Sequence, residues 1–305
     1  MKPAWSVILL TTLIGAGQGL YLALAAAAPG AAPAGFLVAG AALALALLAA
    51  GLAASFFHLG RPERAWRSAA MWRSSWLSRE VIVLPAFMAA VLAWGVAQYS
   101  GLSREIVVWF NLVGVLLAAA LFLCTGMIYA CLKFLQEWHT PLTPMNYAAL
   151  GCASGLSAAA ALSAWLHPPL AASYAVAALA AGALAYLSRL ASLARNARLR
   201  PKSTLATAIG VKHPRIVQIS QGAMGGSFNT REFFHGRPRE LVRAARWAFL
   251  ALVFPLPALL LIAAPRSAPL LTLAFLVQFA GLLAERWYFF AEARHPQNLY
   301  YQAIA

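Results

Sequence analysis

Eight long apolar stretches dominate this chain of 305 residues. A helix that crosses a lipid bilayer needs about 20 mostly apolar residues. Hydrophobic residues make up 62% of the chain and charged residues 10%, whereas soluble domains carry about 25% charged residues. We therefore predict an all-α membrane protein, a bundle of about eight transmembrane helices with large loops on one face. The predicted spans are about 4–27, 35–57, 80–100, 106–132, 147–166, 169–190, 244–264 and 268–290.

Positive charge is concentrated on one face of this predicted bundle. We call the face that carries the N-terminus side A and the opposite face side B. Of the 23 Lys and Arg residues, only Arg104 and Arg266 fall on side B. Because cytoplasmic loops are enriched in Lys and Arg, we predict that side A, with both termini and the large loops, is cytoplasmic. A basic face that docks an acidic partner would give the same bias.

The formal net charge of +15 does not indicate a nucleic-acid-binding protein. The basic residues lie in loops between spans of lipid length, where they set the topology and meet anionic membrane lipid or an acidic partner. The sequence therefore predicts one polytopic membrane domain over residues 1–305, without nucleic acid as a partner.

The histidines and cysteines argue against a metal group in this chain. Axial histidines of a membrane haem lie within facing helices, but none of the 6 His residues lies in the middle of a predicted span. The 3 Cys residues show no ligand spacing for an iron–sulfur cluster. We predict no haem, no iron–sulfur cluster and no other metal site here.

The connection after the second span is the most informative stretch. His58 ends that span and Glu80 begins the next, with Arg61 and Trp66 between them. A titratable pair beside aromatic rings at a membrane interface could hold a quinone head group and exchange protons with it. Each residue also has a purely structural explanation: Trp66 as an interface anchor, His58 as a helix cap, and Glu80 with a capping Ser78 at a helix start.

Other polar residues favour structural roles. For Gln18, in the first span, we predict a hydrogen bond between helices. Glu285 and Arg286 are neighbours in the last span, and we predict that they pair with each other or extend their charged ends toward side A. Trp138, at the side-A end of the fourth span, predicts an interfacial aromatic belt.

The loop of about 191–242 is too long for a simple connector, so we predict that it docks a partner on side A. Its aromatic residues and Gly-Gly turn suit a protein interface. The candidate docking residues are Gln221, Gly225, Gly226, Phe228, Arg231, Phe233 and Phe234.

Several motifs resemble the membrane anchor subunit of dimethyl sulfoxide reductase. They are His58-Leu-Gly-x-Pro-x-x-Ala, Ser78-x-Glu80, Gly17-Gln18 and Thr143-Pro144, and the eight-span plan makes the resemblance nearly full length. The stretches 218–236 and 285–298 are similar to a narrower branch, the membrane subunit of a sulfite-oxidising, quinone-linked molybdoenzyme whose catalytic subunits are cytoplasmic.

The resemblance implies a non-catalytic, quinone-reactive anchor in a bacterial inner membrane. Its partners would be an iron–sulfur electron-transfer subunit and a molybdopterin catalytic subunit. Electrons from sulfite would reach ubiquinone or menaquinone, with His58 and Glu80 as the quinone-site residues that transfer protons.

Two other hypotheses remain. The anchor could work in the opposite direction, oxidising quinol to reduce dimethyl sulfoxide or another sulfur compound. A secondary transporter is disfavoured, because no internal repeat is seen and polar residues within the spans are few.

Overall fold

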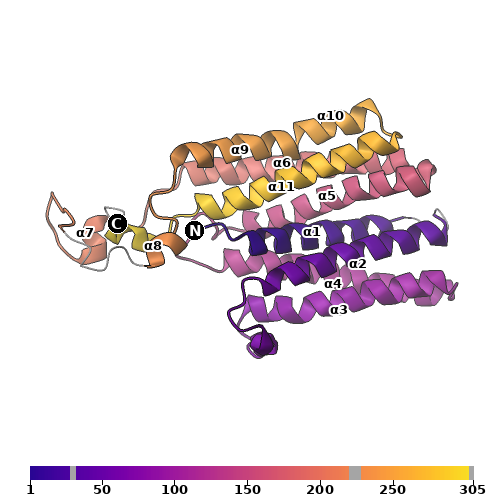
Figure 1. Ribbon diagram of the computed structural model, residues 1–305, viewed down its shortest axis with the longest axis horizontal. Coiled ribbons are helices and arrows are strands. Elements are labelled where there is room, and N and C mark those ends of the chain that lie inside the picture. The colour runs from indigo at the N-terminus through magenta and orange to yellow at the C-terminus, as the bar shows by residue number, and fades with distance from the viewer. Residues whose placement is uncertain (28–31, 220–227, 302–305) are drawn as a thin grey trace.

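The computed structural model describes residues 1–27, 32–219 and 228–301. In these ranges the regular structure is entirely helical, and eight helical segments are long and apolar enough to cross a membrane, which confirms the predicted fold class. The segments lie side by side, with short connections at one end of the bundle and longer ones at the other (Figure 1). The long helices are α1 Trp5–Ala25, α2 Ala34–Phe56, α3 Trp76–Tyr99, α4 Arg104–Ala130, α5 Leu142–Leu166, α6 Ala171–Ala197, α9 Arg239–Val253 with α10 Pro255–Ala263, and α11 Ala268–Glu292.

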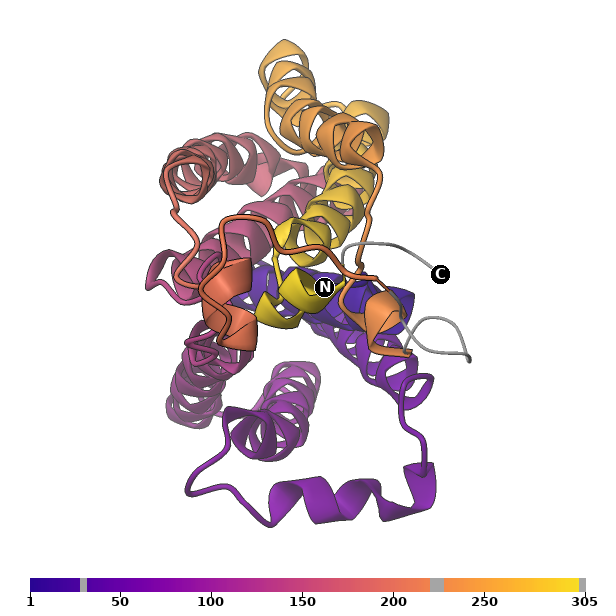
Figure 2. The same cartoon turned by 90° about the vertical axis from the view of Figure 1, so that its left-hand side faces the viewer.

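Helices α1 and α5 form the centre of the bundle. Seen from its end, α2, α3 and α4 pack on one side of this pair and α6, α9, α10 and α11 on the other (Figure 2). The two central helices touch through glycines: a Cβ added to Gly155 would lie 1.9 Å from the backbone carbon of Gly19. Small residues allow such close approach in membranes, where packing rather than hydrophobicity holds helices together.

The seventh span is broken into α9 and α10 at Phe254, unlike the continuous span expected at 244–264. Pro257 has no N–H with which to bond the carbonyl of Val253, four residues earlier. The side chain of Gln278 on α11 donates to this carbonyl instead, at 3.3 Å. The polar side chain of Gln278 thus compensates for the missing backbone donor.

Polar side chains also join α4 to α1. Gln18 Nε2 donates to the carbonyl of Ala118 at 3.1 Å, as expected for a hydrogen bond between helices. Asn111 Nδ2 donates to the carbonyl of Ala25 at 3.2 Å, near side B. Both bonds satisfy polar groups that have no water to bond inside a bilayer.

The segment between α6 and α9 is shorter than the loop expected at 191–242. Helix α6 runs to Ala197 and α9 begins at Arg239, so only 198–238 connect them. Arg189, which lies next to the predicted end of the span at residue 190, is buried inside the helix bundle. The connection contains the short helices α7 Leu205–Ile209 and α8 Phe228–Glu232.

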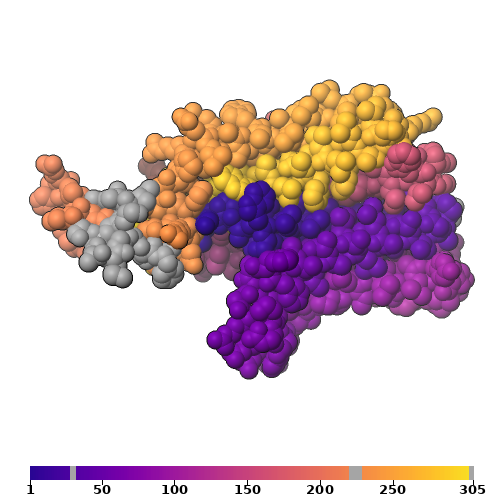
Figure 3. Space-filling model, viewed as in Figure 1, coloured from indigo at the N-terminus to yellow at the C-terminus, as the bar shows by residue number. Residues whose placement is uncertain are grey.

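The connection between α2 and α3 projects from the side of the bundle at the side-A end (Figure 3). It contains a 3-10 helix, Pro62–Ala69, none of whose side chains is buried. The projection therefore presents its Arg and Trp side chains to its surroundings.

The glycine contact between α1 and α5 predicts the effect of adding one methyl group. Gly155→Ala forces the backbones of α1 and α5 apart and should lower the free energy of unfolding by about 1–3 kcal/mol. Gly182→Ala on α6 is the matched control, because no atom lies within 4 Å of the added Cβ. Denaturant titration of the purified protein in detergent measures both variants. Equal stability of the two would contradict the proposed close packing.

Candidate functional site

Glu80 lies near the side-A end of α3 with its carboxyl group inside the bundle. The helix begins at Trp76, and its cap is Ser75 rather than the expected Ser78: Ser75 Oγ accepts a hydrogen bond from the Ser78 N–H at 3.3 Å. Glu80 is 8% exposed, and its Oε1 accepts a hydrogen bond of 2.5 Å from Thr125 Oγ1 on α4. Within the described ranges no residue donates to Oε2, so one carboxyl oxygen is held and the other is available.

The other three predicted quinone-site residues lie on the surface. His58 follows the end of α2, while Arg61 and Trp66 belong to the projecting connection, and all three are exposed. Partial desolvation lowers the pKa of His58 below its ordinary value. No hydrogen bond or ion pair joins Glu80 to any of them in the part of the chain that the structure describes. The structure thus separates a buried carboxyl from an exposed aromatic and basic segment.

Two arginines of the projecting connection and one at the start of α3 lie over tryptophan rings. Arg79 also donates to the carbonyls of Trp72 and Arg73, at 2.9 and 2.8 Å, which ties the connection to the start of α3. Such cation–π pairs favour a membrane interface, where aromatic rings and cationic groups gather. The pairs are Arg67 over Trp66 at 5.4 Å, Arg73 over Trp72 at 5.3 Å and Arg79 over Trp76 at 4.3 Å.

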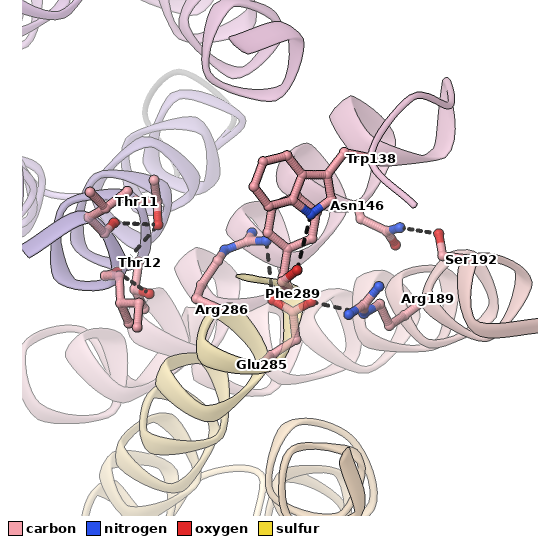
Figure 4. Close-up of polar contacts among 11 residues, drawn as sticks. Thr11, Thr12, Trp138, Asn146, Arg189, Ser192, Glu285, Arg286 and Phe289 are labelled. Atoms are coloured by element: carbon pink, nitrogen blue, oxygen red, sulfur yellow. Dashed lines mark hydrogen bonds and ion pairs between the residues drawn. The ribbon is translucent and has the colours of Figure 1, made fainter. Parts of the chain in front are cut away.

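A cluster of three buried charges occupies the side-A half of the bundle. Glu285 on α11 lies between two arginines, 2.8 Å from Arg189 on α6 and 3.1 Å from its neighbour Arg286 (Figure 4). Side-chain exposure is 5% or less for all three residues. The Arg286 guanidinium also lies 3.7 Å from the ring centroid of Tyr147 on α5. Glu285 and Arg286 therefore pair, one of the two roles expected for them, whereas no local feature of the sequence indicates Arg189 as the third member.

Trp138 is a core residue rather than part of the expected interfacial belt. It is 4% exposed, its ring stacks on Phe289 at 5.1 Å, and its Nε1 donates to the Phe289 carbonyl at 3.0 Å. The expectation was wrong because the partner of Trp138 lies on α11, far away in the sequence. Figure 4 shows this bond beside the charge cluster.

A cavity of about 930 Å³, which we call the vestibule, lies on side A. Burial raises the pKa of Glu137, a carboxyl in its lining. Both acidic and basic groups line the vestibule, so it can hold water or a polar segment. The charged lining residues are Glu137, Lys202, Arg237, Arg239, Arg246, Glu292 and Arg294.

The predicted docking residues are only partly free for a partner. Gln221, Gly225 and Gly226 lie outside the described residues, as does the side chain of Phe228. Arg231 is exposed. Phe233 stacks on His295 at 3.7 Å, and Phe234 packs edge-on against Trp287 at 6.1 Å. These two aromatic side chains therefore contact the C-terminal part of their own chain.

Four other large apolar residues of this connection are exposed on side A. Ile209 is 39%, Val211 49%, Val217 63% and Ile219 98% exposed. Isolated β-branched residues in a basic loop are the signal that could have identified them from the sequence. Exposed apolar side chains outside the membrane are typical of surfaces that bind another protein.

The described residues, 1–27, 32–219 and 228–301, contain no group of three or more His, Cys, Asp or Glu residues that could hold a metal ion.

Comparison with known proteins agrees with this architecture. The model of the DMSO reductase anchor subunit (DmsC) family matches residues 1–301. The sulfite dehydrogenase C subunit of Allochromatium vinosum is 56% identical over 326 aligned positions, which cover 100% of both chains. The chain belongs to the DMSO reductase anchor subunit family and is the membrane anchor of a complex of the sulfite dehydrogenase and DMSO reductase type.

Proposed function

We propose that this chain is the quinone-binding membrane anchor of a molybdoenzyme complex that oxidises sulfite. Electrons from sulfite pass through a molybdopterin catalytic subunit and an iron–sulfur subunit to a quinone bound near side A. The observation that carries this proposal is the 56% sequence identity, over the full length, to a protein named as the C subunit of sulfite dehydrogenase. The molybdopterin and the iron–sulfur clusters belong to the partner subunits. This chain provides the quinone site in the membrane and the residues that transfer protons.

Glu80 is the residue we assign to proton transfer. Its carboxyl is held through Oε1 by Thr125, which leaves Oε2 for the quinone. A bound quinone, ubiquinone or menaquinone, accepts two electrons and two protons and leaves as quinol. A buried carboxyl next to the membrane interface fits the polar end of such a molecule, because a carboxyl group can both donate and accept a proton.

The exposed residues of the connection between α2 and α3 suit the rest of the quinone site. The pKa of His58 is lowered, so its imidazole is mostly neutral at neutral pH and can take up a proton. Phe57 and Trp66, 88% and 71% exposed, offer aromatic surface in the same connection. We assign proton transfer to His58 and contact with the quinone ring to Trp66 and Arg61.

We assign the docking of the iron–sulfur subunit to the connection 198–238 on side A. Val217 and Ile219, together with the exposed Arg231, offer the mixture of apolar and basic groups found at protein interfaces. The concentration of Lys and Arg on this face supports a cytoplasmic orientation in a bacterial inner membrane.

The family also includes the anchor of dimethyl sulfoxide reductase, and this supports a second candidate function. In that case, the same site oxidises quinol, and the partners reduce dimethyl sulfoxide or another sulfur compound. The residues of this chain can serve both quinone reduction and quinol oxidation, because the partners and the quinone pool set the redox potentials.

The first prediction concerns the activity of membranes with and without this chain, the soluble partners being present in both. We expect sulfite-dependent quinone reduction only where the chain is present, measured by the absorbance change of the quinone. An assembled complex that shows no sulfite-dependent quinone reduction would overturn the sulfite assignment. Sulfoxide-dependent quinol oxidation by that complex would establish the second candidate.

Glu80→Gln should lower the kcat of quinone reduction by about tenfold or more, since general acid–base groups contribute about 10²–10⁴-fold. The amide keeps the shape of the side chain and can still bond Thr125, so the subunits should assemble. Glu105→Gln, an exposed residue at the side-B start of α4, is the matched control and should keep full activity. Normal turnover by a fully assembled Glu80→Gln complex would disprove the proton-transfer role.

Orientation and docking can be tested by introducing one cysteine at a time in a Cys131→Ser background, which removes the exposed native cysteine. A membrane-impermeant maleimide should label Lys212→Cys from the cytoplasmic side and Arg266→Cys from the other side, because these exposed residues lie on sides A and B. Assembly of the partner subunits should protect Lys212→Cys and leave Arg266→Cys reactive. Labelling of both from one side would refute the topology, and unchanged labelling of Lys212→Cys in the complex would refute docking at this connection.

A further inference from the structure

Three cavities follow one another from side A toward Glu80. The vestibule shares Glu137 and Asn196 with an inner cavity, and the inner cavity shares Tyr147 and Arg286 with a third. The third cavity reaches Thr125, so we call it the Thr125 cavity. The inner and Thr125 cavities measure about 10 Å³ each, which is close to the space that one buried water molecule needs.

Polar atoms with unused hydrogen-bonding capacity lie along this series. Asn146 Nδ2 donates to Ser192 Oγ at 2.7 Å (Figure 4), while its Oδ1 is buried and, among the described residues, without a partner. The hydroxyl of Tyr147, a residue 3% exposed, is likewise buried, and the Tyr129 hydroxyl is its hydrogen-bonding neighbour. Buried polar atoms almost always have partners, so the Asn146 oxygen indicates bound water.

The Thr125 cavity ends at a hydrogen bond to Glu80. The Thr125 hydroxyl donates a hydrogen bond to Glu80 Oε1 at 2.5 Å. The Thr125 oxygen can also accept a hydrogen bond from a water molecule in the cavity. Thr12 and Ser154 add two more hydroxyl groups to the lining. The cavity therefore offers a water molecule the two to four polar partners that it requires.

The charge cluster lies beside this series, because Arg189, Glu285 and Arg286 line the inner cavity. Glu285 neutralises one of its two arginines, Arg189 and Arg286, so the cluster keeps one net positive charge.

We propose that the three cavities form one proton route from side-A water to Glu80, with the Tyr147 hydroxyl as the relay between the two inner cavities. This inference rests on the proposed function, in which Glu80 gives up a proton for quinone reduction. Each quinone gains two electrons from the partner subunits and two protons from side A. The route supplies Glu80 from inside the bundle and does not pass through the exposed His58.

The sharpest variant is Tyr147→Phe in the complete complex. It removes only the hydroxyl oxygen and keeps the ring that stacks on Tyr129 and lies under Arg286. We expect kcat to fall by about tenfold with an unchanged KM for quinone, and the effect of D₂O on kcat to increase. Tyr174→Phe is the matched control, because its buried hydroxyl bonds the Ala23 carbonyl near side B, away from the route.

Gly15→Ala tests the route by a different change. Gly15 lines the Thr125 cavity, and the nearest atom to an added Cβ is Gly151 Cα at 3.7 Å, so the methyl group fits without a clash. Because the cavity has room for about one water molecule, the methyl group should displace it. We expect the same loss of kcat and the same larger D₂O effect as in Tyr147→Phe.

A second measurement detects the water directly and needs neither sulfite nor quinone. Hydroxyl radicals made by X-ray radiolysis modify side chains next to bound water. In the quinone-free complex, Leu150 of the Thr125 cavity should be modified although it is 1% exposed, whereas the fully buried Tyr21 should not. Gly15→Ala should abolish the modification of Leu150.

The two measurements separate failure of the route from failure of the proposed function. An active complex in which Tyr147→Phe and Gly15→Ala match Tyr174→Phe in kcat and D₂O effect would overturn the route and leave the function intact. An unmodified Leu150 would overturn it as well. Modified Leu150 in a complex without sulfite activity would support the water-filled series and refute the function.

Discussion

One carboxylate, that of Glu285, holds the side-A half of the bundle together. Charges are costly inside a membrane unless they are paired, and Glu285 pairs with arginines of two helices. Removing one member of a buried pair costs about 3–5 kcal/mol, because the other charge is left alone. Arg286 extends the cluster to the Tyr147 ring of α5, and Arg189 lies 5.3 Å from the Phe249 ring of α9. Four helices, α5, α6, α9 and α11, thus meet around the charge cluster that Glu285 holds together.

Close packing of α1 and α5 explains why polar cavities occur beside this cluster. The backbones of Gly19 and Gly155 touch, which brings the neighbouring faces of the two helices together. Along these faces, Gly15 has no side chain to fill the remaining space, and Thr12 and Ser154 supply hydroxyl groups. Glycine therefore acts in two ways: it allows contact at one level of the helix pair and leaves room for water at another.

Apolar length was sufficient to predict the eight spans, because membrane thickness acts on each helix separately. Features that depend on distant partners could not be predicted. Arg189 resembled the start of a loop because its partner Glu285 is far away in the sequence, and Trp138 resembled an interface anchor for the same reason. The seventh span breaks at Phe254, just before Pro255 and Pro257. The span was predicted from average hydropathy, which these two prolines hardly change. For the candidate site, Glu80 was predicted from its place as a titratable residue at the start of a span and from the family resemblance, whereas its bond to Thr125 required the fold.

The buried charge cluster and the three cavities lie in the side-A half of the bundle, and this bears on the energetics of the proposed reaction. Sulfite and one water molecule yield sulfate, two electrons and two protons, while quinone consumes two electrons and two protons. If the partners dock on side A and the proton route opens there, protons are released and consumed on the same face. No net charge then crosses the membrane during turnover. Under the proposed function, the anchor conserves energy only by delivering quinol to the pool.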